Sequence, residues 1–386
     1  MTNDGTISFR IPDGAFFDIV NINLSGNLEG AGTSTFNNIT FNGTSNQTIS
    51  IGGTIYNIQA VTYNNTGTAP NNQITNQSTT FTTAINPGTS TFTRGNYRHD
   101  NTGIYNVSTG TVAFGGADMT VTVLQGTMNF ATGNNVLDQL NLNGGDLIVD
   151  GPNAVVNVGG NETTDRQKLL TNGTTADITV QNGGTLNVGN GTYGDIRFDG
   201  NAGTMWVTGT SITGKSSEVN CGRIVTGNNA GNGGTLTISD GAIMRVRYNA
   251  TTAGPAVLFR GTSTIRVESG AQFLIGNPTN STGNLEADEN NSFVRNMTVD
   301  NATVRVYGRW LVSAGVNNTN TRFDIDNGSQ FIVSENVINV GAAQTCNLGR
   351  ATINVNSGST VRLFQNAQSA NNVNVCVIGA GGQFEH

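Results

Sequence analysis

The sequence predicts an all-β fold, a single-stranded parallel β-helix or β-solenoid, in which successive coils of the chain stack on one another. The main indication is a recurring phrase of two short strands, each written apolar-x-apolar, separated by a bend that usually contains Gly. The even spacing of the phrase, about 29 residues, is typical of one coil per repeat. Its copies begin at Ile178, Met205, Leu236, Ile265, Met297, Phe323 and Ile353, and every step between them is close to that spacing.

The order of residues within each phrase explains why the coils stack. Strand side chains alternate between two faces, so the apolar residues of each triplet point inward and the residue between them points outward. Gly permits the sharp bend between the two strands. One coil cannot bury its apolar row alone, whereas stacked coils bury a continuous one.

The composition agrees with such a chain. Gly accounts for 52 of the 386 residues, Pro for 6, and charged residues for 11%, which is typical of a chain with many turns and uncharged strands. Disordered chains have too few β-branched and aromatic residues to build a core. Here Val, Ile, Leu and Phe recur at strand spacing, and no long helix pattern is present.

The repeat divides the chain into three parts. Residues 121–386 predict a regular β-solenoid, in which triplets at Val121 and Leu140 precede the copy at Ile178, with one short step followed by one long step. Residues 31–120 predict irregular coils of about 20 residues, with loops. Residues 1–30 contain the apolar segment from Ile7 to Leu24, which predicts either a cap over the core or a segment that pairs with another subunit.

Charge and hydropathy narrow the range of partners. The net charge of −7 and the pI of about 4.8 disfavour nucleic acid, which needs Lys and Arg gathered on one face. No apolar run approaches the roughly 18 to 20 residues of a membrane span, and no signal-peptide pattern is present. Cys346 and Cys376 are separated by the length of one coil, so we expect them on adjacent rungs, either bonded or as free thiols.

Three phrases carry a family resemblance: Phe36–Gly43, Gly233–Ala242 and Ile353–Ser359. They resemble repeats of bacterial surface proteins with right-handed parallel β-helix passengers, such as autotransporter and haemagglutinin-like adhesins. The resemblance spans most of the chain. It implies an extracellular location at a cell surface and a structural or adhesive role, and it supplies no catalytic residues.

One segment, Gly209–Ser216, matches the phosphate-binding loop pattern G-x-x-x-x-G-K-[ST]. Such a loop needs a following helix, whose N-terminal amides hold the phosphate. The residues after Ser216 predict a strand instead, so a turn between coils is the favoured interpretation.

A group of three carboxylates, Glu286, Asp288 and Glu289, falls within one short stretch of an Asn-rich loop. It is a candidate for weak calcium binding, and the alternative is an ordinary solvated loop. No other cofactor is expected.

The chain is not expected to be an enzyme. Acids such as Asp177, Asp195 and Asp300 occur on or near predicted strands, but the sequence shows no cluster of them with a basic partner at matching positions of consecutive coils. Glycan-cleaving enzymes need paired carboxylates beside a groove. His99 and the two lysines, Lys168 and Lys215, leave few of the residues that usually transfer protons.

The outward positions favour an interaction surface. Trp206 stands out in the first-strand row, and the second-strand row mixes Arg with apolar residues. Arg and aromatic residues are enriched in interfaces, although isolated exposed apolar residues are normal on any surface. The candidate interface residues are Phe9, Ile11, Phe16, Phe17, Ile19, Trp206, Arg245, Arg305, Arg362 and Phe384.

Together these features predict an extracellular structural or adhesive β-solenoid of a cell surface. Its last coil has no charged or helical cap, so either the chain belongs to a longer protein or this end pairs with another chain. Its expected partner is itself, through head-to-tail stacking into a filament or sheath. The alternative is a glycan-binding or glycan-cleaving β-helix, such as a phage tailspike or polysaccharide lyase, with surface glycans as partners.

Overall fold

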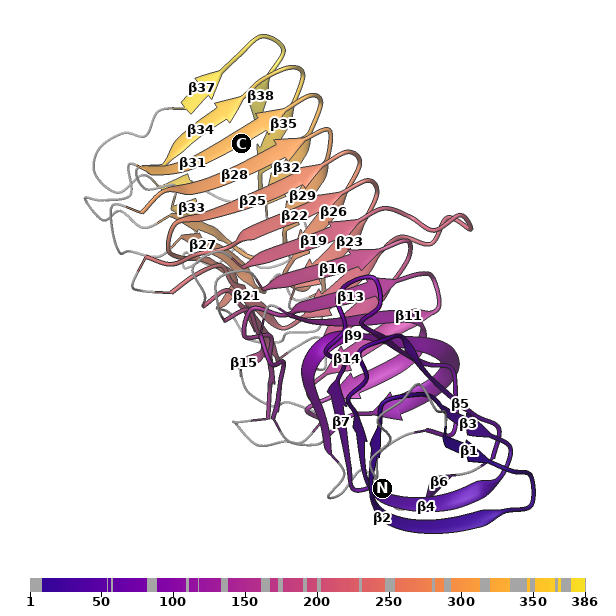
Figure 1. Cartoon of the computed structure of the whole chain (residues 1–386). Helices are drawn as coiled ribbons and strands as arrows, with labels where there is room; N and C mark the ends of the chain where they lie inside the picture. Colours follow the sequence, from indigo (N-terminus) through magenta and orange to yellow (C-terminus); the bar gives the residue numbers. More distant parts are fainter. Residues whose placement is uncertain are drawn as a thin grey trace.

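The structure is a computed structural model that shows an elongated stack of parallel strands, with the two ends of the chain at opposite ends of the stack (Figure 1). This confirms the predicted β-solenoid. Within the described residues no helix is long and apolar enough to cross a membrane. The described residues are 9–53, 55–56, 58–81, 89–108, 111–116, 118–132, 138–160, 167–172, 176–189, 193–199, 203–228, 231–246, 254–279, 282–287, 293–312, 320–333, 346–347, 351–364, 367–368 and 376–385.

Each two-strand phrase contributes one strand to each of two faces. The first face contains β13 (Asp146–Asp150), β16 (Asp177–Gln181), β19 (Thr204–Thr208), β22 (Thr235–Ser239), β25 (Ser263–Glu268), β28 (Arg295–Asp300), β31 (Thr321–Asp326), β34 (Thr352–Val355) and β37 (Cys376–Ile378). The second face contains β14 (Ala154–Val158), β17 (Thr185–Val188), β20 (Glu218–Cys221), β23 (Ile243–Val246), β26 (Gln272–Ile275), β29 (Thr303–Val306), β32 (Gln330–Val333), β35 (Thr360–Leu363) and β38 (Gln383–Glu385).

The register on the first face is the one that the repeat predicts. Each residue that begins a copy lies opposite the residue that begins the next, from Ile178 opposite Met205 to Phe323 opposite Ile353. The strands are parallel throughout. One step of the repeat is therefore one full coil.

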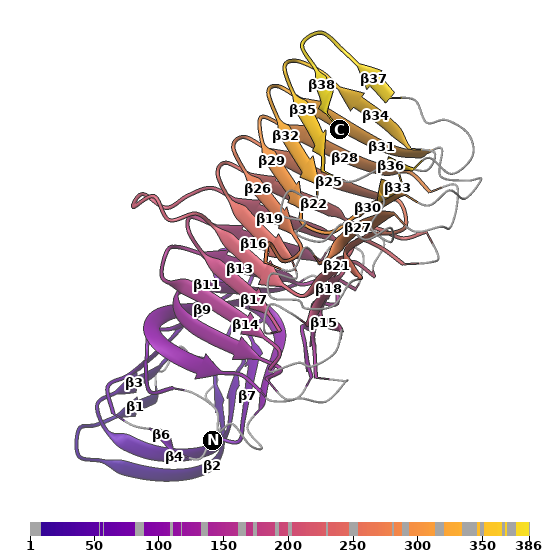
Figure 2. The same ribbon diagram turned by 180° about the vertical axis from the view of Figure 1, so that it is seen from behind.

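A third face carries a strand that the sequence analysis missed. Its ten-stranded sheet lies along one side of the stack, as Figure 2 shows. Its members are β10 (Val112–Ala113), β12 (Leu140–Asn141), β15 (Gln167–Leu170), β18 (Asp195–Arg197), β21 (Arg223–Val225), β24 (Pro255–Phe259), β27 (Asn284–Ala287), β30 (Trp310–Val312), β33 (Cys346–Asn347) and β36 (Ala367–Gln368).

The prediction of one short and one long step before Ile178 is wrong, because of the third face. Leu140 lies on β12 of that face, so it does not begin a copy of the phrase. Val121 lies opposite Leu147, and Leu147 lies opposite Ile178. Both steps are therefore close to the common coil length.

The expected placement of Cys346 and Cys376 on adjacent rungs is also wrong. Cys346 lies on β33 of the third face, whereas Cys376 lies on β37 of the first face. The reason is that the last coils are shorter than the average, since Ile353 lies opposite Cys376 and Cys346 lies opposite Ala367.

The N-terminal coils have two strand ladders, whereas the later coils have three. One ladder joins β1 (Phe9–Ile11), β3 (Leu28–Gly30), β5 (Gln47–Ile51) and β8 (Gln73–Asn76), and a second joins β2 (Phe16–Leu24), β4 (Thr33–Phe41), β6 (Ile55–Tyr56) and β7 (Ala60–Asn64). Leu28 lies opposite Ile49, which agrees with the shorter coils predicted for this part of the chain. Residues 9–30 thus contribute strands to the stack itself.

The number of strand ladders increases at β9 (Thr89–Asn106), which turns through three faces. Residues 89–94 pair with β7, residues 96–99 with β8 and β11 (Met119–Phe130), and residues 104–106 with β11 alone. A bridge between Phe92 and Phe114 joins the first of these segments to the third-face side. The second face therefore begins at the end of β9.

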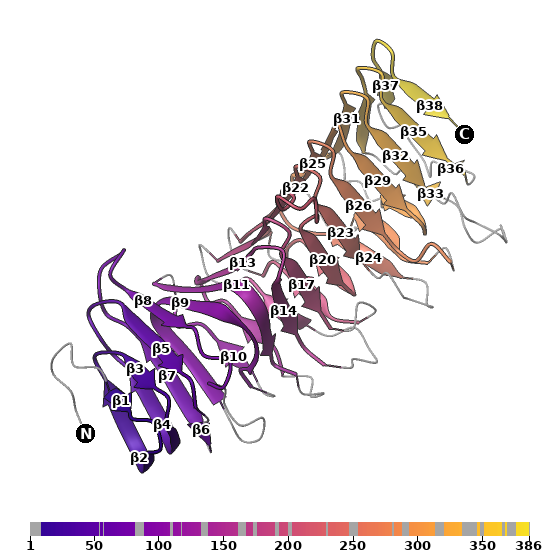
Figure 3. The same ribbon diagram turned by 90° about the vertical axis from the view of Figure 1, so that its right-hand side faces the viewer.

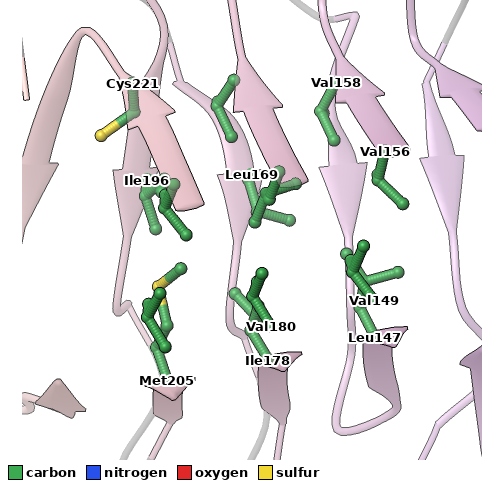
Figure 4. Close-up of a cluster of buried hydrophobic side chains, with 14 of the residues drawn as sticks. Leu147, Val149, Val156, Val158, Leu169, Ile178, Val180, Ile196, Met205 and Cys221 are labelled. Atoms are coloured by element: carbon green, nitrogen blue, oxygen red, sulfur yellow. The ribbon is translucent and has the colours of Figure 1, made fainter. Parts of the chain in front are cut away.

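The core is one continuous column of apolar side chains. Figure 4 shows part of it, in which Leu147 and Val149 of the first face point toward Val156 and Val158 of the second face, and Leu169 of the third face lies in the same core. All five side chains are fully buried. The alternation that the sequence predicts therefore produces a filled interior.

Tight bends join the first face to the second. In the bend after β16, Asn182 has a φ of 54° and Gly183 a φ of 86°, and the Gly184 N–H donates to the Gln181 carbonyl at 3.0 Å. Two consecutive residues with positive φ are the geometry of a type I′ turn, which favours Asn followed by Gly. These bends match the bends expected from the phrase.

Candidate interaction surfaces

Trp206 is the main exposed aromatic residue of the first face. It lies at the centre of β19, with Thr179 and Thr237 opposite it on the neighbouring rungs. Its side chain is 37% exposed. The face around it therefore presents one half-exposed indole between hydroxyl-bearing side chains.

The second face carries an asparagine ladder that runs through the centres of its strands. Five outward asparagines occupy the same position on consecutive rungs, and each side-chain amide donates to the carbonyl oxygen of the preceding one. The distances are 2.8 Å from Asn129 to Asn106, 2.9 Å from Asn157 to Asn129, 2.9 Å from Asn187 to Asn157, and 3.0 Å from Asn220 to Asn187. Chains of amides polarise one another, so the ladder adds stiffness along the stack.

The asparagine ladder predicts graded losses of stability on substitution. Asn157→Ala removes two inter-rung hydrogen bonds and should lower the free energy of unfolding by about 1 to 3 kcal/mol. Asn220→Ala, at the end of the ladder, removes one bond and should cost about half as much. Urea denaturation followed by circular dichroism measures the free energy of unfolding of both variants. Equal losses would show that the loss does not depend on the number of inter-rung hydrogen bonds removed.

The candidate arginines follow the ladder on the same face. Arg245 lies opposite Asn220, and from it the row runs through Leu274, Arg305, Ile332 and Arg362 in register. Arg245 pairs with Glu218 at 3.1 Å, and Arg362 pairs with Glu385 at 2.6 Å. Because these two arginines already have acidic partners, they are less available to a ligand than the sequence analysis implied.

The segment that matches the phosphate-binding loop pattern forms a hairpin between β19 and β20. Thr210 and Ser216 form an antiparallel bridge, and the hairpin projects beyond the neighbouring bends (Figure 1). The Lys215 ammonium group donates to the Pro152 carbonyl at 2.6 Å and to the Thr185 hydroxyl at 3.1 Å. The next element is the strand β20, so the lysine fastens the hairpin to earlier coils and the preference for a turn is confirmed.

Charged residues do meet on consecutive rungs of the third face. Asp195 lies opposite Arg223 and is fully buried, and the Arg223 Nε donates to its carboxylate at 3.0 Å. The sequence did not predict this pair, because the third strand was not predicted. A buried carboxylate beside a guanidinium is a fixed structural ion pair.

Two carboxylates also lie side by side on the first face. Asp146 and Asp177 lie on the consecutive rungs β13 and β16, and the Asp177 N–H donates to the Asp146 carboxylate at 3.2 Å. Burial, opposed by this hydrogen bond, raises the pKa of Asp146 to about 6. Burial also raises the pKa of Asp177.

Only one member of the candidate calcium group lies in the described part of the chain. Glu286 is on β27 and accepts a hydrogen bond from the Asn284 side-chain amide at 2.8 Å. Asp288 and Glu289 lie outside the described residues. Among the described residues there is no group of three or more His, Cys, Asp or Glu side chains that could hold a metal ion.

The N-terminal end of the stack is apolar. Within the described residues β1 pairs only with β3, and β2 pairs only with β4. Ile11 is fully buried, and Phe9 and Ile19 are partly buried against the core. Phe16 is 62% exposed and Phe17 is 37% exposed. Four of the five candidate residues at this end therefore keep some exposed surface, whereas Ile11 belongs to the core.

The C-terminal end of the stack is also apolar. In the part of the chain that the structure describes, β37 pairs only with β34 and β38 only with β35. Ile378 is 52% exposed at this end, and Phe384 is partly buried against the core. Figure 3 shows the two ends facing in opposite directions along the stack.

Comparisons of the chain with family models, with curated proteins and with solved structures found no match. Its function is therefore inferred from its own residues and contacts.

Proposed function

We propose that the chain is an extracellular structural or adhesive β-solenoid of a cell surface, without catalytic activity, that assembles end to end into a filament or sheath. The bacterial surface β-helix proteins that its repeats resemble have this role. The observation that carries the proposal is that, among the described residues, the strands of the first and the last rung each pair on one side only. Strands with an unpaired edge present rows of N–H and C=O groups, which template pairing with another chain.

The rest of the molecule suits a rigid rod. Parallel ladders run along all three faces, and the core column continues through the described coils. In a solenoid each coil contacts only its neighbours, so an added copy extends the rod without changing its interior. A repeated head-to-tail contact that does not close gives a filament.

Electron microscopy of the purified protein over a range of concentrations tests this proposal. Filaments that lengthen with concentration are the expected result. Isolated particles at every concentration, together with a monomeric mass in light scattering, would contradict it.

Exposed phenylalanines at the N-terminal end give a sharper test than deletion of the first coil. Deleting residues before Leu24 would uncover β3 and β4, which offer a similar edge. The Phe16→Lys/Phe17→Lys variant instead adds charge to the end. Full burial of one phenylalanine contributes about 1.5 to 3 kcal/mol, so the association constant should fall by about tenfold or more.

A matched control is available for this variant. Ile104 is 59% exposed on β9, away from both ends. Ile104→Lys should assemble like the parent protein. An equal loss of assembly in both variants would indicate a general effect of charge. It would contradict a contact at the N-terminal end.

A second candidate function, glycan binding, is favoured by Trp206. A partly exposed indole flanked by Thr179 and Thr237 on the neighbouring rungs fits a sugar ring, which has one apolar face and a polar rim. Trp206→Ala should abolish binding in a screen of acidic and neutral polysaccharides, and it should leave filament formation unchanged. Binding that persists in this variant would place any glycan site elsewhere.

A further inference from the structure

We infer that the end-to-end contact is one more rung of the first face, in which β37 of one copy pairs in parallel with β1 of the next, with Val377 opposite Arg10. This inference rests on the proposed end-to-end assembly and specifies its contact. Both strands belong to the ladder of the first face, β1 at its beginning and β37 at its end.

The hydrogen bonds of β1 show which of its backbone groups face the end. The Phe9 N–H donates to the Asn27 carbonyl at 2.7 Å, so Phe9 bonds toward β3. In a parallel sheet the N–H and C=O of one residue bond to the same neighbouring strand, and the next residue bonds to the opposite side. The N–H and C=O of Arg10 therefore point away from β3, toward the end of the stack.

The hydrogen bonds of β37 show the complementary pattern. The Gly379 N–H donates to the Val355 carbonyl at 2.8 Å, so Gly379 and, by alternation, Val377 bond toward β34. The backbone groups of Cys376 and Ile378 consequently point to the outer edge. With Arg10 opposite Val377, the Arg10 N–H meets the Cys376 carbonyl and the Ile378 N–H meets the Arg10 carbonyl.

The alternation of side chains selects the same register. On β34, Ile353 and Val355 are buried in the core column, and Ile378 lies opposite Val355 on the next rung. On β1, Ile11 is buried and Arg10 is exposed. Val377 opposite Arg10 brings Ile378 next to Ile11, so the exposed isoleucine of one copy extends the core of the next. A slip by one residue would put Arg10 into that core.

The charge on β1 argues against pairing of two N-terminal ends. A two-fold symmetric contact would bring two β1 strands together antiparallel, and the symmetric register centred on β1 would place Arg10 opposite Arg10. Like charges directly opposite each other destabilise a strand pair. Pairing of unlike ends avoids this repulsion and keeps every strand parallel.

The two ends differ in their number of faces, which limits the contact to part of each coil. Among the described residues the coil of β1 and β2 has no strand on the second face, because that face begins at β9. The β1 strand then covers β37, and β2 lies on the side of β36. The β38 strand keeps its outer edge free at each junction.

Chemical crosslinking of two introduced cysteines tests the register. The variant carries Arg10→Cys and Val377→Cys, with Cys346→Ser and Cys376→Ser to remove the native thiols other than buried Cys221. Opposed residues on paired strands lie about 5 Å apart, so a short bis-maleimide should link successive copies. A ladder of covalent dimers, trimers and longer species on denaturing gels is expected.

The two single-cysteine variants distinguish the arrangement of the ends. Arg10→Cys alone should give no covalent dimer, and neither should Val377→Cys alone. Dimers from Arg10→Cys alone would show that N-terminal ends pair with each other, and dimers from Val377→Cys alone would show the same for C-terminal ends. Either result would overturn the inference.

Proline at position 10 tests the hydrogen bonds themselves. Arg10→Pro removes the outward N–H and keeps the bonds between β1 and β3, so the monomer should fold and the concentration needed for assembly should rise about tenfold or more. Arg10→Thr keeps the N–H and serves as the control. Filaments that form without any crosslink and tolerate Arg10→Pro would contradict this strand pairing but not end-to-end assembly. The absence of filaments in the parent protein would contradict both.

Discussion

Replacement of Trp310 with alanine is expected to lower the free energy of unfolding of the C-terminal coils by about 3 to 5 kcal/mol. Trp310 lies on β30 with its side chain fully buried. Its ring centroid lies 4.8 Å from that of Phe323 and 4.6 Å from that of Phe331, on the two other faces. Removal of the indole would therefore leave a cavity between all three faces of one coil.

The loss of stability should remain local, because each coil of a solenoid contacts only its neighbours. Hydrogen exchange followed by mass spectrometry should show faster exchange in β27, β30 and β31 and unchanged exchange in β4 and β7. Faster exchange over the whole chain would contradict this nearest-neighbour behaviour.

Phenylalanine at the same position is the matched control. The Trp310 Nε1–H is buried and has no hydrogen-bond partner among the described residues. Trp310→Phe removes this unsatisfied donor while keeping most of the aromatic volume, so it should cost about 1 kcal/mol or less. A loss of stability as large as that of the alanine variant would mean that the indole N–H makes a stabilising hydrogen bond.

Acidification from pH 7 to pH 4 is expected to destabilise the junction around β9 through His99. The His99 side chain is buried in β9, with its ring 6.2 Å from that of Tyr105. Its Nδ1 lies 3.4 Å from the Asn101 amide nitrogen and its Nε2 lies 3.4 Å from the Gly103 carbonyl oxygen. Burial lowers the pKa of His99 to about 4, against 6.5 for an exposed imidazole.

The sign of the pH effect follows from these two values. Above pH 6.5 the imidazole is neutral in both the folded and the unfolded chain, so it has no effect on stability. Between pH 6.5 and pH 4 the unfolded chain binds the proton more readily, and stability falls as the pH falls. The full loss below pH 4 amounts to about 3 kcal/mol.

Asp146 acts in the opposite direction over part of the same range. Burial raises the pKa of Asp146 to about 6, so the folded chain takes up this proton first and gains stability as the pH falls toward 4. The carboxyl is partly exposed, so its contribution is smaller than the shift alone suggests. Denaturation curves of His99→Gln and Asp146→Asn at pH 7 and pH 4, in dilute protein, separate the two groups. A parent protein and a His99→Gln variant with equal pH dependence would contradict the role of His99.

The sequence predicted the first and second faces well because their triplets repeat at a fixed spacing. The step from Leu236 to Ile265, for example, is a register pair of the structure. The third strand was missed because several of its outward positions are also apolar. Leu170, Val225 and Leu258 are all at most 8% exposed, so these strands show no alternation of apolar and polar residues.

The surfaces were predictable only in part. The outward position of Trp206 follows from its place between two inward residues, and the structure agrees. The asparagine ladder was not placed on these strands, because Asn is common throughout the chain, although Asn157 and Asn187 both stand at the centre of an apolar triplet. A search of the central triplet position at coil spacing would have found it. The burial of Ile11 depends on contact with the next rung of the stack. The pattern of neighbouring residues in the sequence does not show that contact.

The change from two ladders to three at β9 has a mechanical consequence. Each ladder resists bending along the stack, so the two-ladder coils before β9 form the compliant part of the molecule and the three-faced coils after it form the stiff part. Thermal bending and applied load should therefore concentrate N-terminal to β9. A filament built by joining unlike ends would alternate short flexible segments with longer rigid ones, and its flexibility would be set by the number of two-ladder coils in each copy.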